Sequence, residues 1–246
     1  MSWNLILDFG NTHLKASLFF GGELKEHHTL EAPTAEAVLE IAGGKPVGAG
    51  LLASVRTDDA GLEQALSEFF PVHRLGPGSE LPLQNHYATP ETLGFDRIAA
   101  SCAAGQLFAG RPVLAIVAGT CITYNFTTAR GEFLGGAISP GIHMRLRSMH
   151  EYTQKLPLVS PEGETAFPAN STETALRTGA VHGARAEITA LFEELRTTYP
   201  DLAAVIGGGD ALLLANGLKN DIFARPFLVQ EGLNRILEYH VSKLPR

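Results

Sequence analysis

Residues 5–15 read LILDFGNTHLK, an apolar run that ends in the carboxylate of Asp8 and passes through Gly-Asn-Thr into a second alternating run. The pattern predicts a strand, a tight turn and a second strand, with Asp8 at the edge of a sheet. Gly10 lets the backbone approach a ligand because it has no Cβ. The turn amides suit phosphate oxygens, and the carboxylate suits Mg²⁺. An ordinary β-hairpin whose turn happens to contain these residues is the alternative.

Composition places the chain among globular proteins. Its 246 residues are 45% hydrophobic and 18% charged, which fits one large domain or two smaller ones. The net charge of −7 argues against a nucleic-acid partner, whose binding needs an excess of Lys and Arg. No apolar run approaches the ~20 residues of a membrane span, and the first residues lack a basic leader region, so we expect no membrane association. Cys102 and Cys121 form no metal-ligand pattern, and reduced thiols predict a cytoplasmic location.

The order of the predicted elements repeats along the chain. Three strands in a meander come first, followed by alternating helix and strand, and residues 112–138 again give strand, Gly-Thr turn, strand, turn and strand. Such a repeat predicts an α/β protein with two similar lobes, each a mixed sheet flanked by helices, facing each other across a cleft. We place the two lobes at residues 1–110 and 111–246. Two chance hairpins are the alternative explanation of the repeat.

Two further segments carry residue types suited to chemistry. A long loop over residues 76–92 leads into Gly94-Phe95-Asp96-Arg97 and a helix of small residues, which places Asp96 at or near a helix N-terminus. Plain N-capping is the alternative role for that carboxylate. Three glycines at 207–209 follow an apolar strand and precede a helix. There they either let a nucleotide lie against the backbone or serve as an ordinary tight connection.

Together these motifs form an ordered set that spans nearly the whole chain. In order they are Asp8-x-Gly10-Asn11-Thr12, Tyr87 ahead of Gly94-x-Asp96-Arg97, Gly119-Thr120, Gly135-Gly136-x-Ile138-x-Pro140-Gly141, Thr172 before Gly179, and Gly207-Gly208. The set resembles the type III pantothenate kinases, within the superfamily of acetate and sugar kinases, heat-shock proteins and actin. The resemblance implies duplicated ribonuclease-H-like lobes with mixed five-stranded sheets, an ATP cleft between them, and a homodimer.

The resemblance also implies an activity and the residues that perform it. The reaction would be the ATP-dependent phosphorylation of pantothenate to 4′-phosphopantothenate, the first step of coenzyme A biosynthesis, with Mg²⁺ as a cofactor. Asp96 matches the catalytic base, and Asp8 would serve Mg²⁺. The implied ATP-binding residues are Asp8, Phe9, Gly10, Asn11, Thr12, His13, Leu14, Lys15, Gly119, Thr120, Gly207 and Gly208. The implied pantothenate-binding residues are Tyr87, Gly94, Phe95, Asp96, Arg97 and Thr172.

One position departs from the family pattern. The family has Asp two residues before Gly119, at a position linked to a monovalent cation (K⁺ or NH₄⁺), and this chain has Val117 there. A valine side chain cannot ligate a hard cation, so the cation site is either lost or rebuilt from other oxygens. Asn125, at a position where an acidic residue is frequent in related turns, cannot supply the missing charge.

Three explanations of Val117 stay open: a K⁺-independent kinase, a kinase with weak nucleotide affinity, and a non-catalytic relative that binds nucleotide or pantothenate and acts as a regulator. A sugar or acetate kinase of the same superfamily is a further alternative, but it leaves the Gly-x-Asp-Arg segment with its upstream Tyr unexplained.

Overall fold

The computed structural model describes residues 2–10, 14–31, 33–54, 60–218 and 222–243. Their contacts divide the chain into two compact units, Met1–Ala103 together with Val229–Arg246, and Ala104–Leu228. The C-terminal helix therefore groups with the first unit, whereas the boundary expected after residue 110 assigns it to the second lobe. Within the described ranges, no helix combines the length and the apolar character needed to cross a membrane.

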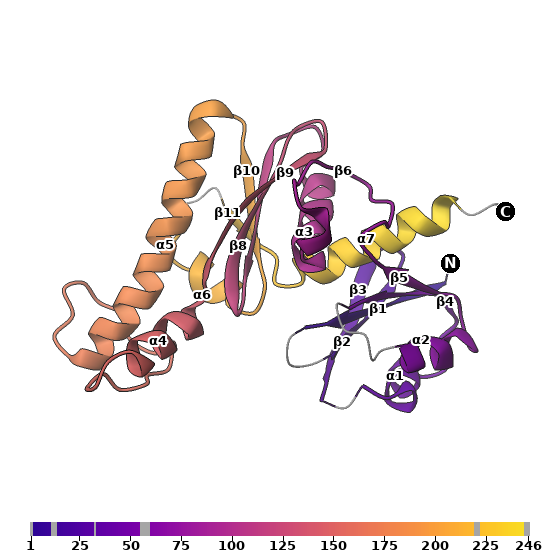
Figure 1. The fold of residues 1–246 in the computed structure, drawn as a ribbon, viewed down its shortest axis with the longest axis horizontal. Coiled ribbons are helices and arrows are strands. Elements are labelled where there is room, and N and C mark those ends of the chain that lie inside the picture. Colours follow the sequence, from indigo (N-terminus) through magenta and orange to yellow (C-terminus); the bar gives the residue numbers. More distant parts are fainter. Residues whose placement is uncertain (1, 11–13, 32, 55–59, 219–221, 244–246) are drawn as a thin grey trace. The chain divides into compact units, whose positions relative to one another are not determined.

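The first unit is built on a five-stranded mixed sheet (Figure 1). Its strands are β1 (Trp3–Phe9), β2 (Leu14–Phe20), β3 (Glu23–Leu30), β4 (Val47–Ala53) and β5 (Val72–Leu75). They lie in the order β3-β2-β1-β4-β5, with β1, β2 and β3 antiparallel and β4 and β5 parallel to β1. The opening meander predicted from the sequence is thereby confirmed.

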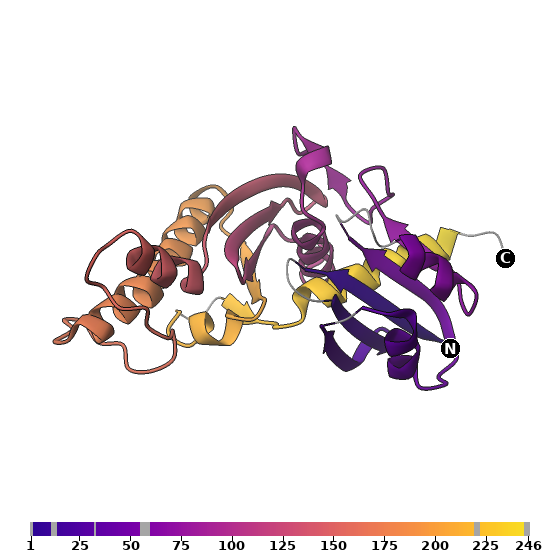
Figure 2. The ribbon, with the colours of Figure 1, turned by 60° about the horizontal axis from the view of Figure 1, so that its bottom comes forward.

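Helices cover both faces of this first sheet. α1 (Ala35–Ala42) and α2 (Ala60–Ser67) pack on the face that holds Leu5 and the other odd-numbered residues of β1. α7 (Leu228–Lys243) lies along the opposite face, as Figures 1 and 2 show from two directions. Alternate side chains of a strand point to opposite faces, so Asp8 and the other even-numbered residues of β1 face α7.

The second unit repeats this topology. Its strands are β7 (Val113–Ala118), β8 (Cys121–Thr127), β9 (Glu132–Pro140), β10 (Ala203–Gly207) and β11 (Ile222–Ala224). They lie in the order β9-β8-β7-β10-β11, with β7, β8 and β9 antiparallel and β10 and β11 parallel to β7. These five strands follow one another in the same order as the strands of the first sheet. The predicted duplication is confirmed, and the chance-hairpin alternative is wrong.

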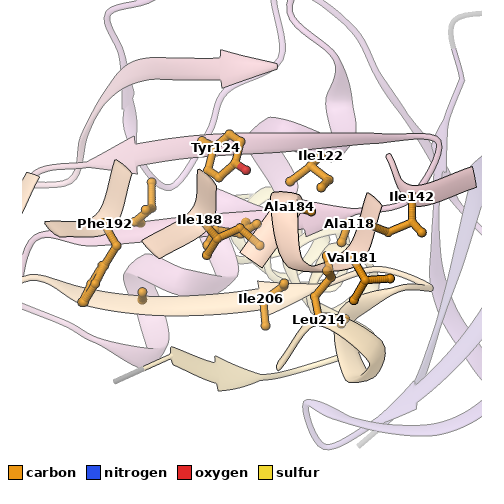
Figure 3. Packing of buried hydrophobic residues seen from close by; sticks show 14 of the residues in the cluster. Ala118, Ile122, Tyr124, Ile142, Val181, Ala184, Ile188, Phe192, Ile206 and Leu214 are labelled. Atoms are coloured by element: carbon orange, nitrogen blue, oxygen red, sulfur yellow. The ribbon is translucent and has the colours of Figure 1, made fainter. Parts of the chain in front are cut away.

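Three helices cover one face of the second sheet. They are α4 (Ile142–Glu151), α5 (Thr172–Thr198) and α6 (Ala211–Ala215), and all three contribute to one apolar cluster with β7, β8 and β10. Figure 3 shows this packing, with Ile188 of α5 close to Tyr124 of β8. The core therefore fixes α4 and α5 against the strands that carry the Gly-Thr turn.

The long loop predicted over residues 76–92 contains only two short elements, β6 (Gln84–Asn85) and the 3₁₀ helix η1 (Pro90–Thr92). α3 (Phe95–Leu107) follows, and its small residues permit the very close packing that the sequence predicts. A Cβ at Gly232 of α7 would lie 1.8 Å from the carbonyl oxygen of Ala99, so α3 and α7 are in backbone contact.

Candidate functional site

The first carboxylate of the candidate site lies near the end of β1. Asp8 pairs with Lys15 across β1 and β2, so the two strands predicted on either side of the turn are present. Phe9 and Leu14 are buried in the apolar cluster under α1 and α2, so only their main chains are available to a ligand. The predicted contacts of Asn11, Thr12 and His13 lie outside the described residues.

The surroundings of Asp8 oppose its ionisation. Burial raises the pKa of the Asp8 carboxyl above its usual range, the Lys15 ammonium lowers it, the Asp96 carboxylate raises it, and a hydrogen bond from Gln230 lowers it, with a net rise. The two predicted functional carboxylates belong to the same unit, and the charge of Asp96 disfavours the ionised form of Asp8. A bound cation would relieve this repulsion.

α7 supplies polar contacts to this carboxylate that the sequence analysis missed. Gln230 Nε2 donates to Asp8 Oδ2 over 3.2 Å, and Asn4 Nδ2 donates to Asn234 Oδ1 over 2.8 Å. Gln230 and Asn234 are buried and lie four residues apart, on the helix face turned to the sheet. In the sequence, two polar residues at this spacing within an otherwise apolar face of a helix indicate that they have buried polar partners.

The second carboxylate stands in the first turn of α3. The main-chain amides of Arg97 and Ile98 both donate to Gly94 O, over 3.2 and 3.4 Å, so Gly94 takes the capping position and Asp96 lies inside the helix. Plain N-capping by Asp96 is therefore not its role. Asp96 is exposed. Its carboxylate lies next to Gly94, where an added Cβ would be 2.5 Å from Asp96 Oδ1. Gly94 thus leaves room for the carboxylate.

The predicted pantothenate-binding residues of the first unit cluster beside this turn. Arg97 is buried, and its Nη1 donates to the Tyr87 hydroxyl over 3.4 Å. The Arg97 Cζ also lies 5.3 Å from the centre of the Tyr87 ring, in a cation–π arrangement. Phe95 is half-buried next to Asp96. Thr172 belongs to the second unit, at the exposed start of α5, where Ser171 caps the helix.

In the second unit, glycines from separate segments meet around the Gly119-Thr120 turn. Gly207 pairs with Val117, which places Gly208 beside Ala118, and a Cβ at Gly208 would lie 2.3 Å from Ala118 O. The Gly141 amide donates to Thr120 O over 3.1 Å, and a Cβ at Gly141 would lie 2.0 Å from Gly119 O. Main-chain segments thus pack directly against one another around this turn, at a distance that only glycine permits.

Val117 occupies the predicted cation position on β7. It is half-buried and lies between Thr123 of β8 and Gly207 of β10. Asn125 is fully buried, and its Nδ2 donates to Ala115 O over 3.1 Å and to Thr123 Oγ1 over 3.0 Å. The residue opposite Val117 on β8 is Thr123, whose hydroxyl accepts this hydrogen bond from Asn125.

We expect Gly208→Ala to disrupt this turn. Gly208 has a φ of +93°, and its Cβ would collide with main-chain atoms of Ala118, so the substitution costs about 2 kcal/mol or more. The Tm falls by several degrees, and binding of the nucleotide implied by the family resemblance weakens.

Gly209→Ala is the matched control, because a Cβ at Gly209 meets nothing within 4 Å. Thermal unfolding and nucleotide titration of both variants check the expectation. Equal behaviour of the two variants would contradict the close approach at Gly208.

Comparisons with known proteins agree on one family. The family model for type III pantothenate kinase matches residues 4–194. A type III pantothenate kinase of Phocaeicola vulgatus is 40% identical over 238 residues, covering 96% of this chain and 98% of its own.

Solved structures show the fold alone, since their identities are low. A Campylobacter jejuni protein, described as a putative Baf family transcriptional activator, has a TM-score of 0.58 at 19% identity, over 98% of this chain and 100% of its own. A ROK family glucokinase from Streptomyces griseus, solved with glucose and AMPPNP, has a TM-score of 0.52 at 12% identity, over 96% of this chain and 98% of its own.

Proposed function

Because the chain belongs to the type III pantothenate kinase family, we propose that it transfers the γ-phosphoryl group of ATP to pantothenate and forms 4′-phosphopantothenate. The full-length similarity to named pantothenate kinases carries this conclusion. The relatives give no support to a non-catalytic regulator.

The roles of the residues follow from the chemistry of phosphoryl transfer. The primary hydroxyl oxygen of pantothenate bonds to the γ-phosphorus, the bond from that phosphorus to the β-phosphate oxygen breaks, and ADP leaves. Asp96 accepts the hydroxyl proton late in the transfer. Its exposed position in the first turn of α3 supports this role. Arg97, stacked on Tyr87, offers a planar fork for the carboxylate of pantothenate.

Alignment and charge neutralisation dominate the remaining catalysis. The β1–β2 hairpin and the Gly119-Thr120 turn supply amides to the phosphates, and Gly207 and Gly208 lie near the adenosine. Asp8 offers the hard oxygens that Mg²⁺ prefers, and Mg²⁺ binds most often through one or two carboxylates plus phosphates and water. When bound, Mg²⁺ neutralises charge on the phosphates.

Two further features belong to this proposal. A homodimer follows from the family resemblance, and size-exclusion chromatography with light scattering tests it. A cytoplasmic location is supported by the two cysteines, Cys102 and Cys121, which are both free.

We expect turnover without a monovalent cation activator. Valine offers no oxygen at the position that the family pattern links to K⁺. The rates in Na⁺, K⁺, NH₄⁺ and a large organic cation should then agree within about threefold at equal ionic strength. Val117→Asp is the informative variant, since a restored carboxylate should introduce a preference among the cations. A strict requirement of the wild type for K⁺ or NH₄⁺ would show instead that other oxygens rebuild the site.

Ligand-induced thermal shifts separate this proposal from its alternatives. ATP with Mg²⁺ and pantothenate should each raise the Tm, whereas glucose and acetate should leave it unchanged, because a ligand stabilises only a protein that binds it. A shift with a sugar in place of pantothenate would point to another kinase of the superfamily.

A further inference from the structure

A polar cluster in the second unit takes no part in the roles given so far. Glu187, on α5, accepts hydrogen bonds from three elements at once. Tyr124 of β8 donates to its Oε1 over 2.6 Å, Ser139 of β9 donates to the same oxygen, and Arg145 Nη2 of α4 donates to its Oε2 over 2.6 Å. The Arg145 and Glu187 side chains are 20% and 29% exposed, so this pair is more shielded than an ordinary surface salt bridge.

The cluster connects directly to the Gly119-Thr120 turn. Arg145 Nε donates to Pro140 O over 2.8 Å, so the same guanidinium holds both Glu187 and the last residue of β9. The next residue, Gly141, lies flat on the turn through its 3.1 Å hydrogen bond to Thr120 O. A chain of contacts therefore runs from α5 through one guanidinium to the turn.

The charges suit a rigid brace. Burial raises the pKa of the Glu187 carboxyl, and the hydrogen bonds from Ser139, Tyr124 and Arg145 lower it further than burial raises it, so the net shift is downward. Glu187 is then ionised at neutral pH, and its hydrogen bonds are charge-assisted. The planar guanidinium of Arg145 binds in several directions at once, which a lysine ammonium on a flexible stem does less rigidly.

We propose that Glu187 and Arg145 are positioning residues that hold the Gly119-Thr120 turn in the shape that binds the phosphates of ATP. This inference rests on the proposed kinase function. Misplacement by a fraction of an ångström is costly at a phosphate-binding turn, because the amides must point at the ligand together. A brace that only joined α4 and α5 would not need the bond to Pro140 O.

The test measures ATP and pantothenate binding separately from stability. Arg145→Ala and Glu187→Gln should raise the Kd for ATP about tenfold, while the Kd for pantothenate changes less than about threefold. Arg145→Lys should recover part of the loss. Direct nucleotide titration gives the Kd values, and steady-state kinetics should show the matching rise in KM for ATP.

Arg111→Ala is the matched control. Arg111 also binds a main-chain carbonyl through two nitrogens, Nε and Nη2, which donate to Asp201 O over 3.1 and 2.9 Å. It lies at the opposite end of β7 and β10 from the glycine turns. Arg111 is exposed and its hydrogen bonds go to a neutral carbonyl, so its loss should lower the Tm less than the loss of Arg145 and leave the Kd for ATP unchanged.

Two results would overturn the inference and leave the proposed kinase function in place. An unchanged Kd for ATP in Arg145→Ala, with only the Tm lowered, would make the cluster purely structural. Equal weakening of ATP binding in Arg111→Ala would show a general effect of lost stability. If Glu187→Gln fails to fold, Tyr124→Phe replaces it, because this variant removes only one hydrogen-bond donor to Glu187. We expect it to raise the Kd for ATP as well, by a smaller factor. A wild type that binds no ATP would remove the kinase function itself, and the inference with it.

Discussion

Asp96→Asn should lower kcat about a thousandfold, within the range that general bases contribute. Asparagine keeps the size of the side chain but cannot accept the hydroxyl proton of pantothenate. The affinities for ATP and pantothenate should stay within about threefold, because the substitution removes an interaction made mainly in the transition state. A pantothenate-dependent ADP-release assay and ligand titrations measure these quantities.

Glu36→Gln is the control for the change of charge. Glu36 is an exposed carboxylate in the first turn of α1, in the same unit as Asp96, so its loss removes a comparable interaction with a helix dipole. We expect full activity from that variant. An Asp96→Asn enzyme that retains more than about a tenth of the wild-type kcat would mean that another group accepts the proton.

Asp8→Asn should lower activity at least a hundredfold, because the amide cannot replace a carboxylate as a ligand for Mg²⁺. Its stability should move the other way. Since burial and Asp96 raise the pKa of Asp8, the folded state holds the proton of this carboxyl more tightly than the unfolded state. Above the pKa that this carboxyl has in the unfolded state, ionisation of Asp8 therefore lowers the free energy of unfolding. Asparagine does not ionise, so the variant avoids this loss of stability.

The measurement compares the Tm of Asp8→Asn with that of the wild type from acidic to neutral pH, without Mg²⁺. The Tm of the variant should rise relative to that of the wild type as the pH increases. In a second measurement, electron paramagnetic resonance should show weaker binding of Mn²⁺ to the variant. A Tm well below that of the wild type at neutral pH would show that Asp8 is instead a stabilising residue of the fold.

Local patterns were enough to predict the duplicated fold. The alternation of residues 5–9 and the Gly-Thr turn at 119–120 specify hairpins, and hairpins pair residues that are near in sequence. The glycines at 207–209 were predicted to allow a close approach or a tight connection, and Gly207 and Gly208 do show a clash for an added Cβ. The clashes at Gly94 and Gly141 were not predicted.

Long-range contacts could not be predicted in the same way. Gln230 meets Asp8 across 222 residues, and Asn234 meets Asn4 across 230, so the partners of α7 depend on how the chain returns to the first sheet. That return also explains why the boundary expected after residue 110 differs from the contact-based units in the placement of α7. Glu187 joins donors from β8, β9 and α4, and their meeting follows only from the packing of α5.

The central claim is tested most directly by coupling ADP release to mass-spectrometric detection of the product, with and without pantothenate, for the wild type and Asp96→Asn. We predict that ADP forms only when pantothenate is present, in equal amount to 4′-phosphopantothenate, and that both disappear together in the variant. ADP release without any need for pantothenate, or none under every cation tested although both ligands bind, would contradict the assignment of this chain as an active pantothenate kinase.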